Sequence, residues 1–180
     1  MKNLITALIF ATIAAGCGAG QYGYARYYAP YGAEDDFLER AEPLSYEEIR
    51  RDPADFQETL VGWFGIVQGE PEIDPASGET TVVLNFRAHQ TRHLCRTEHA
   101  DSCRVTVSER PGGSFSARLV VREADRQGAE RINVGSLLKV YGTATLEFND
   151  EGGPILQVEH YRHWPRGTYV TTGHAGIMRR

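Results

Sequence analysis

The stretch TLVGWFGIVQ, residues 59–68, decides the fold that the sequence predicts. Its apolar residues fall on both faces of an extended chain, as in a strand that is buried on both sides. Gly62 and Gly65 interrupt the stretch and predict a bulge or a bend at a barrel corner, because glycine inside a strand marks such positions. A first strand of this kind favours a closed barrel over a sandwich.

Four further segments have the alternation or the apolar character of strands. They are residues 80–86, 115–122, 137–146 and 155–164. The sequence NDEGGP at 149–154 predicts a hairpin turn between the last two strands. Five strands with one longer connection, residues 123–136, predict a mainly β fold: a small five-stranded OB-fold-like antiparallel barrel, with a sandwich as the alternative.

A short helix precedes the first strand. Ser45 and Glu48 have the spacing of a capping box, and Arg50 and Arg51 suit the last helical turn. Pro53 disfavours helix at the residue before it, so the helix spans about two turns. We expect this helix to open the barrel domain, residues 45–166, which a C-terminal tail at 167–180 follows.

The N-terminus has the layout of a secretory signal peptide. A short positive start leads into an apolar run at residues 4–15, which is too short to span a bilayer. The small residues AAG at 14–16 precede Cys17 and resemble the lipobox of bacterial lipoproteins. We therefore expect residues 1–16 to be removed and Cys17 to be lipidated, which attaches the chain to a membrane. The alternative is an ordinary cleaved signal with an incidental cysteine.

The residues after Cys17 predict a tether. Residues 17–44 are rich in Gly, Ala and Tyr and have neither a helical nor a strand period. A flexible chain of this length has a root-mean-square reach of roughly 30 Å. The five tyrosines between positions 22 and 31 fit a membrane interface beside the lipid, or they belong to a low-complexity spacer.

The overall charge limits the possible partners. The 180 residues hold 19 basic and 24 acidic side chains, for a net charge of -5, which argues against nucleic acid as the partner. No apolar run reaches the roughly 18 residues that a membrane-spanning helix needs, so a polytopic protein is excluded. Besides the membrane, we expect an envelope protein or a glycan as a partner.

Cys95 and Cys103 are the cysteines that remain after lipidation of Cys17. Their spacing does not match a zinc knuckle or ribbon, and two cysteines this close in an oxidising compartment usually form a disulfide. The alternatives are a metal site with the neighbouring histidines and acids, or free thiols. We expect a disulfide at the neck of a hairpin, contributing roughly 2.5 kcal/mol in the chain-entropy model.

The middle of the chain is locally basic. Residues 87–131 hold nine arginines against six acidic residues, the reverse of the overall balance. This surplus predicts a surface for an anionic glycan, a lipid headgroup or a protein patch. The competing interpretation is that these arginines are solvated edge residues that limit strand pairing and maintain solubility. The candidate ligand-binding residues around the hairpin are Arg87, Arg92, Arg96 and Arg104.

Catalytic motifs are missing from the sequence. It contains no G-x-S-x-G, S-x-x-K, H-E-x-x-H or phosphate-binding loop. We therefore expect no enzyme, no catalytic residue, no metal and no cofactor. The aromatic residues Trp63, Phe86, Tyr141 and Trp164 have the chemistry to stack on bases or sugars, but on strands such residues are more often core.

Three parts of the barrel region carry a family resemblance: residues 52–67, residues 134–144 with their V-x-G-T pattern, and the closing YRHW at 161–164. Together they resemble the Slp family of starvation-inducible outer-membrane lipoproteins, which pair a lipobox with an OB-like barrel. The resemblance covers residues 45–164 and carries no catalytic residues. With Gly18 after the cysteine, where lipoproteins retained at the inner membrane have Asp, it implies an outer-membrane location facing the periplasm.

These observations predict a lipid-anchored envelope lipoprotein with a non-enzymatic structural or binding role. The alternative is an OB-fold module that binds an oligosaccharide or another anionic polymer.

Overall fold

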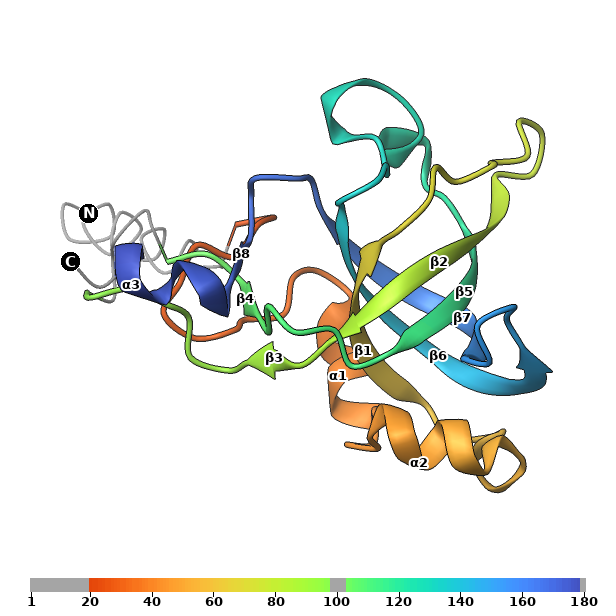
Figure 1. Ribbon diagram of the computed structural model, residues 1–180. Coiled ribbons are helices and arrows are strands. Elements are labelled where there is room, and N and C mark those ends of the chain that lie inside the picture. Colours follow the sequence, from red (N-terminus) through yellow and green to blue (C-terminus); the bar gives the residue numbers. More distant parts are fainter. Residues whose placement is uncertain (1–19, 98–102, 179–180) are drawn as a thin grey trace, which may run out of the picture.

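Five strands close into a barrel in the computed structural model, which describes residues 20–97 and 103–178. The strands are β1 (Val61–Val67), β2 (Glu79–Arg87), β5 (Ser114–Val120), β6 (Leu137–Phe148) and β7 (Pro154–Trp164). They follow each other around the barrel in the order β1-β2-β5-β7-β6, and β6 pairs with β1 to close it. Among these five barrel strands, the β5–β7 pair is parallel and the other pairs are antiparallel (Figure 1). The predicted mainly β, OB-like barrel is confirmed, and its five strands match the five predicted segments.

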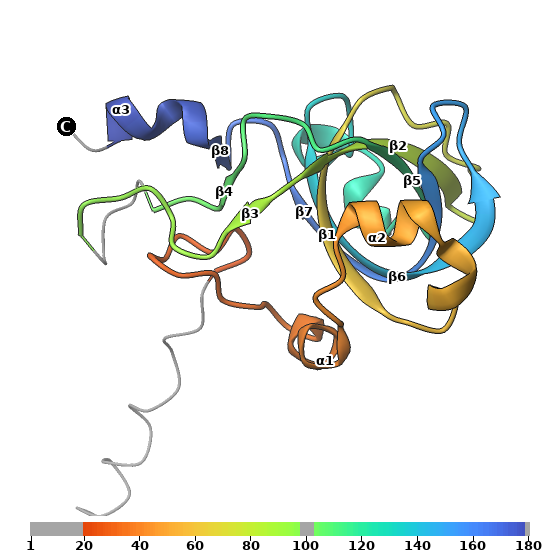
Figure 2. The same ribbon diagram turned by 60° about the horizontal axis from the view of Figure 1, so that its bottom comes forward.

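The barrel encloses the main hydrophobic core. Inward residues alternate along the strands, as the buried Val82 and Leu84 of β2 show between exposed neighbours. Helix α2 (Tyr46–Arg51) lies across one end of the barrel, where Ile49 is fully buried (Figure 2). The predicted capping box is present at its start: the Ser45 hydroxyl accepts from the Glu48 amide, and the Glu48 carboxylate accepts from the Ser45 amide. The short helix η1 (Pro53–Phe56) then leads to β1.

The glycines of β1 have a different role from the expected one. The register of β1 with β2 and with β6 runs without a shift, so β1 contains no bulge. A Cβ on Gly62 would lie 2.8 Å from the Tyr141 ring, and a Cβ on Gly65 would lie 2.9 Å from the Phe115 ring. The bulge is in β7 instead: Tyr141 pairs with His160 and Gly142 pairs with Val158, so Glu159 of β7 has no partner residue on β6. The glycines of β1 make room for aromatic rings, a packing reason that strand periodicity does not contain.

Two connections follow the sequence prediction. The segment between β5 and β6 forms the short helices η2 (Glu123–Asp125) and η3 (Gly128–Glu130). The turn between β6 and β7 closes with a hydrogen bond from the Asn149 amide to the Gly153 carbonyl oxygen at 2.8 Å. Gly152 in this turn has φ +73°, a left-handed conformation that favours glycine.

A second, smaller sheet lies beside the barrel. Its strands are β3 (His89–Gln90), β4 (Thr106–Val107) and β8 (Val170–Thr171), in the order β3-β4-β8. The short helices η4 (Thr172–His174) and α3 (Ala175–Met178) follow β8. We define the accessory lobe as residues 20–33, 88–97, 103–109 and 165–178, which lie together at one end of the molecule in both views (Figures 1 and 2). The predicted tail at 167–180 thus contributes a strand to this lobe.

The expected flexible tether at 17–44 is corrected by the structure for its described residues, 20–44. Arg26 to Tyr28 pair with Thr91 to His93, through hydrogen bonds from the Tyr28 amide to the Thr91 carbonyl and from the His93 amide to the Arg26 carbonyl. The segment continues into helix α1 (Glu34–Arg40), and the Glu42 amide donates to the Leu60 carbonyl at 2.8 Å. No helix in the described part of the chain is long and apolar enough to cross a membrane.

Candidate functional site

The outer face of β2, β5 and β7 has adjoining hollows. The first, about 340 Å³, includes Thr81, Arg118 and Val120. A second, about 330 Å³, shares Thr81 and continues to Phe148 at the β6–β7 turn. A third, about 250 Å³, shares Val120 and continues along β7 to Tyr161. We call this surface the β2–β5–β7 face.

The chemistry of the β2–β5–β7 face is apolar in the middle and acidic at the rim. Val83, Val120 and Phe148 are exposed there. The acids that line the hollows are Glu79, Asp150, Glu151 and Glu159. Arg118 is already paired with Glu147. A neutral or cationic partner with apolar side chains therefore fits this face better than an anionic polymer.

The aromatic residues considered for stacking lie elsewhere. Trp63, Tyr141 and Trp164 are buried, and Phe86 packs against the core. The Trp63 indole donates to the Leu44 carbonyl, and the Trp164 indole donates to the Tyr22 carbonyl. Their aromatic faces are filled by protein neighbours, so they offer no platform for sugars or bases.

The structure separates the predicted arginine cluster into two pairs. Arg87 donates to the carbonyl oxygen of Glu109, and Arg104 donates to that of Gly167 at 2.7 Å. Both hold the accessory lobe together. Arg92 and Arg96 are exposed beside the disulfide hairpin. Of the four arginines predicted to bind a ligand, only Arg92 and Arg96 therefore contribute exposed positive charge at this hairpin.

The predicted disulfide is present. Cys95 and Cys103 are bonded, with their Cα atoms 5.1 Å apart, at the neck of the segment between β3 and β4. Cys103 is fully buried. Cys17, the predicted lipidation site, lies outside the described residues, as does the predicted signal peptide at 1–16.

A buried ionic cluster attaches the N-terminal segment to the barrel wall. Glu34 of α1 is fully buried and forms two ion pairs. Its Oε2 atom lies 2.9 Å from Arg162 Nη1 of β7, and its Oε1 atom lies 3.6 Å from Lys139 Nζ of β6. The hydroxyls of Tyr28 and Tyr141 donate to the same carboxylate. We call these five residues the Glu34 cluster. No sequence motif predicted this cluster, because its members come from three separate parts of the chain.

Burial and charge shift the titration of this cluster. Burial opposes ionisation of Glu34, but the hydrogen bond from Tyr28 and the charges of Lys139 and Arg162 hold the pKa of Glu34 below its usual range. Burial also lowers the pKa of Lys139 to about 8, against the attraction of Glu34. The Lys139 ammonium lies 4.2 Å from the centre of the Tyr28 ring and 4.8 Å from that of Tyr141. Aromatic faces thus replace part of the water that this cation loses.

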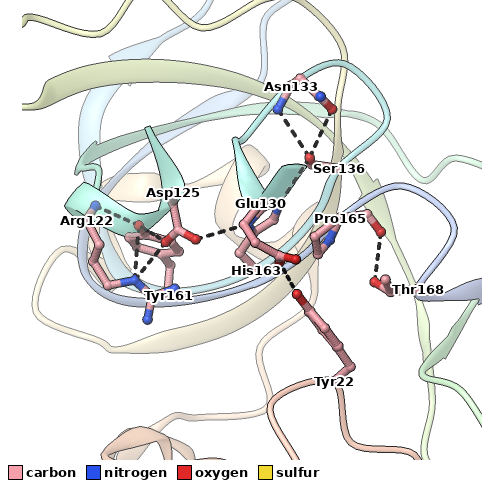
Figure 3. A network of polar contacts seen from close by, with 10 residues as sticks. All are labelled: Tyr22, Arg122, Asp125, Glu130, Asn133, Ser136, Tyr161, His163, Pro165 and Thr168. Atoms are coloured by element: carbon pink, nitrogen blue, oxygen red, sulfur yellow. Dashed lines mark hydrogen bonds and ion pairs between the residues drawn. The ribbon is translucent and has the colours of Figure 1, made fainter. Parts of the chain in front are cut away.

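A second buried polar network joins η2 to the barrel (Figure 3). His163 Nδ1 lies 3.2 Å from Asp125 Oδ1, and His163 Nε2 lies 3.0 Å from Ser136 Oγ. The other carboxylate oxygen, Asp125 Oδ2, accepts from the Tyr161 hydroxyl at 2.6 Å and from Arg122 Nε at 2.8 Å. Burial opposes ionisation of Asp125, but hydrogen bonds from His163 and Tyr161 and the charge of Arg122 lower its pKa.

Ser136, His163 and Asp125 have the connectivity of a hydrolytic triad, which the sequence motifs did not reveal. In such a triad the carboxylate holds one ring nitrogen and the other faces the serine hydroxyl. Here the Ser136 hydroxyl also has a second acceptor, because it donates to Asn133 Oδ1 at 3.3 Å. Ser136 is fully buried, however, and its oxygen also accepts from the Asn133 amide at 3.2 Å. A substrate has no access to this oxygen. The network holds the connection between β5 and β6 against β7.

Two histidines lie between the lobe and the barrel: His93 is buried and His89 is half-buried. The His89 ring stacks on Phe64 with centroids 4.6 Å apart, and the Tyr28 ring lies edge-on to the His93 ring with centroids 6.4 Å apart. Burial lowers the pKa of His89 to about 3 and that of His93 to about 4. Neither ring nitrogen of the buried His93 has a hydrogen-bond partner within the described residues. Across those residues, no three His, Cys, Asp or Glu side chains gather closely enough to hold a metal ion.

Comparison with known proteins does not assign the chain to a family. No protein-family model matches the sequence, and no curated protein is similar to it at a significant level.

Proposed function

We propose that the protein is a lipid-anchored envelope lipoprotein whose OB-like barrel has a non-enzymatic binding role. The observation that carries the binding role is the β2–β5–β7 face, where three adjoining hollows occur on one exposed part of the barrel wall. The anchor rests on the AAGC boundary behind the apolar run at 4–15. By the resemblance to the Slp family, the location is the outer membrane, facing the periplasm.

The chemistry of the face favours a protein partner. Exposed Val83, Val120 and Phe148 offer apolar contact, and the acidic rim complements a basic segment. The alternative ligand, an oligosaccharide or another anionic polymer, has less support, because acids line the hollows and the aromatic platforms are buried. A partner of this class would bind with affinity that falls as salt rises.

The anchor is tested by membrane fractionation of the wild type and of Cys17→Ser. We expect the wild type in the membrane fraction and the variant in the soluble fraction. The double variant Cys95→Ser/Cys103→Ser is the control, because it replaces the other two cysteines and leaves the anchor in place, and it should fractionate like the wild type. Equal distribution of wild type and Cys17→Ser would contradict the lipoprotein assignment.

The binding face is tested by cross-linking in intact envelopes. Photo-reactive residues at Val83 and Val120 should give discrete adducts with a protein, and one at the exposed Arg51 of α2 should not. The substitution Phe148→Asp should remove the adducts while leaving the fold intact, since Phe148 is exposed at the end of its strand. The absence of specific adducts at both face positions would overturn the binding role.

A further inference from the structure

The described N-terminal segment leaves very little chain between the barrel and the proposed lipid. Arg162 donates to the Gln21 carbonyl at 2.9 Å, and the Trp164 indole donates to the Tyr22 carbonyl at 3.1 Å. Docking of the segment therefore begins within a few residues of Cys17. Three residue steps separate Cys17 from Gly20, and they span roughly 11 Å at most. The roughly 30 Å reach expected of a flexible tether is thus not available while the segment is docked.

The charge of the accessory lobe is opposite to that of the whole chain. Its described residues contain five arginines and one acid, Glu109. The arginines are Arg26, Arg92, Arg96, Arg104 and Arg166. None of the five forms an ion pair within the described residues. On the barrel, by contrast, Arg118, Arg122, Arg126 and Arg131 each pair with a carboxylate.

Exposed aromatic and apolar side chains accompany this charge. Tyr24, Tyr27 and Tyr31 are 46%, 52% and 49% exposed, and Ile177 of α3 is 75% exposed. Tyr27 is bridged to Arg92 by backbone pairing, which places a tyrosine beside an exposed arginine. Tyrosine is favoured at the interface between lipid and water, because its ring is apolar and its hydroxyl is hydrated. Arginine beside such rings is attracted to anionic headgroups.

We propose that the accessory lobe binds an anionic phospholipid surface and so fixes the barrel at the membrane in one orientation. This inference rests on the proposed lipid anchor. The docked segment brings the lobe within about 11 Å of the lipidated residue. The exposed Arg92, Arg96 and Arg166 and the exposed tyrosines supply the contacts. In Figure 1 the β6–β7 turn, which borders the β2–β5–β7 face, lies at the end of the molecule away from the lobe. In this orientation the edge of the face at the β6–β7 turn is held away from the bilayer.

The test uses the mature chain carrying Cys17→Ser, so that acylation does not dominate the binding. Vesicles of phosphatidylcholine with 30% phosphatidylglycerol are compared with vesicles of phosphatidylcholine alone in a flotation assay. We expect binding to the anionic vesicles that weakens with salt. Substituting Arg92→Gln and Arg96→Gln should weaken it roughly 30-fold, because each arginine near the surface contributes about fivefold.

The matched control is Arg50→Gln with Arg51→Gln, which removes the same charge from α2 on the barrel. This control should bind like the parent chain. Equal binding to neutral and anionic vesicles, or equal loss in both double variants, would overturn the lobe assignment. Fractionation of Cys17→Ser in cells reports on the anchor separately, so failure of the lobe and failure of the anchor are distinguishable.

Orientation is measured on the acylated wild type in vesicles that contain a spin-labelled headgroup lipid. Paramagnetic broadening should be strong for Tyr24 and Tyr27 and weak for Phe148. Equal broadening at both ends of the molecule would contradict a fixed orientation. Binding to anionic vesicles with the same broadening at Tyr24, Tyr27 and Phe148 would show that the lobe does not orient the barrel.

Discussion

The barrel and the accessory lobe are stabilised in different ways. The barrel has one continuous core of 17 buried residues, and the cluster that supports the lobe has five. Three of those five, Phe64, Leu137 and Trp164, belong to barrel strands, so the lobe supplies only Val105 and Val107. The lobe instead relies on a disulfide, on hydrogen bonds to carbonyl groups and on the Glu34 cluster. The two regions also differ in their arginines: the five of the lobe form no ion pair within the described residues, whereas four arginines of the barrel are each paired with a carboxylate.

The largest expected effect comes from removing the carboxylate that joins the two regions. Glu34→Ala leaves Lys139 and Arg162 buried without their anion, which costs about 3–5 kcal/mol of unfolding free energy. Urea denaturation measures the loss, and limited proteolysis should show cleavage between residues 20 and 44. Asp36→Ala, in the same helix but exposed, is the control and should change neither measurement.

A cavity in the barrel core should destabilise both regions together. Leu84 is fully buried, and Leu84→Ala should cost about 3 kcal/mol, since a large core side chain leaves a cavity. Because the lobe rests on barrel residues, hydrogen exchange should accelerate in β4 as well as in β2. Faster exchange confined to the barrel would show that the lobe folds independently and would break the comparison.

The disulfide should act on the lobe alone. Cys95→Ser with Cys103→Ser removes a cross-link worth at most roughly 2.5 kcal/mol in the chain-entropy model. Hydrogen exchange in β3, β4 and β8 should accelerate, and exchange in β1 and β6 should stay as in the wild type. Equal acceleration in both sheets would mean that the disulfide stabilises the whole molecule.

Acid should weaken the contact between the two regions. The folded pKa values of His89 and His93, about 3 and about 4, are below the usual 6.5, so the unfolded chain binds more protons between those limits. Stability contributed by the neutral rings is therefore present above pH 6.5 and is lost as pH falls towards 4. The melting temperature of His89→Phe/His93→Leu should depend less on pH in this window. Glu34 and Asp125 titrate in both proteins, so the difference between the two profiles isolates the histidines. Parallel profiles would refute the assignment.

The smallest effect is expected at an exposed ion pair of the barrel. Arg118 and Glu147 form a surface pair, and such pairs contribute about 0–1 kcal/mol. Arg118→Ala should therefore leave the urea midpoint nearly unchanged. A loss comparable to that of Glu34→Ala would show that pairing at the barrel surface, and not burial, carries the ionic contribution.

The strands of the barrel were predictable because their pattern is local. Alternation along residues 80–86 matches burial on one face, and a two-residue period needs no knowledge of the partner strand. Residues 137–146 were also recognisable as a strand, although residues 137–142 are buried on both faces. The capping box at Ser45 and the turn at Asn149 are equally local. The disulfide was predictable from spacing and compartment. Bounds agreed to within about two residues for each strand.

The candidate sites were much less predictable. The Glu34 cluster joins residues 28 and 34 to residues 139, 141 and 162, and the network at Asp125 joins three segments of the second half. Each side chain looks ordinary in its own stretch of sequence. The segment 20–44 was predicted as a tether for the same reason: it has no period of its own, and its structure depends on contacts with the barrel.

The sequence by itself therefore determined the five strands, helix α2, the disulfide and the imbalance of charge, since each depends on residues that are neighbours in the chain. Only the tertiary structure decided which arginines are paired, which aromatic rings are buried and where the N-terminal segment lies. Those outcomes depend on closure of the barrel, which places β6 and β7 against residues 20–44. Lys139 of β6 and Arg162 of β7 then form buried ion pairs with Glu34. Burial makes that contact strong, and burial is a property of the assembled fold.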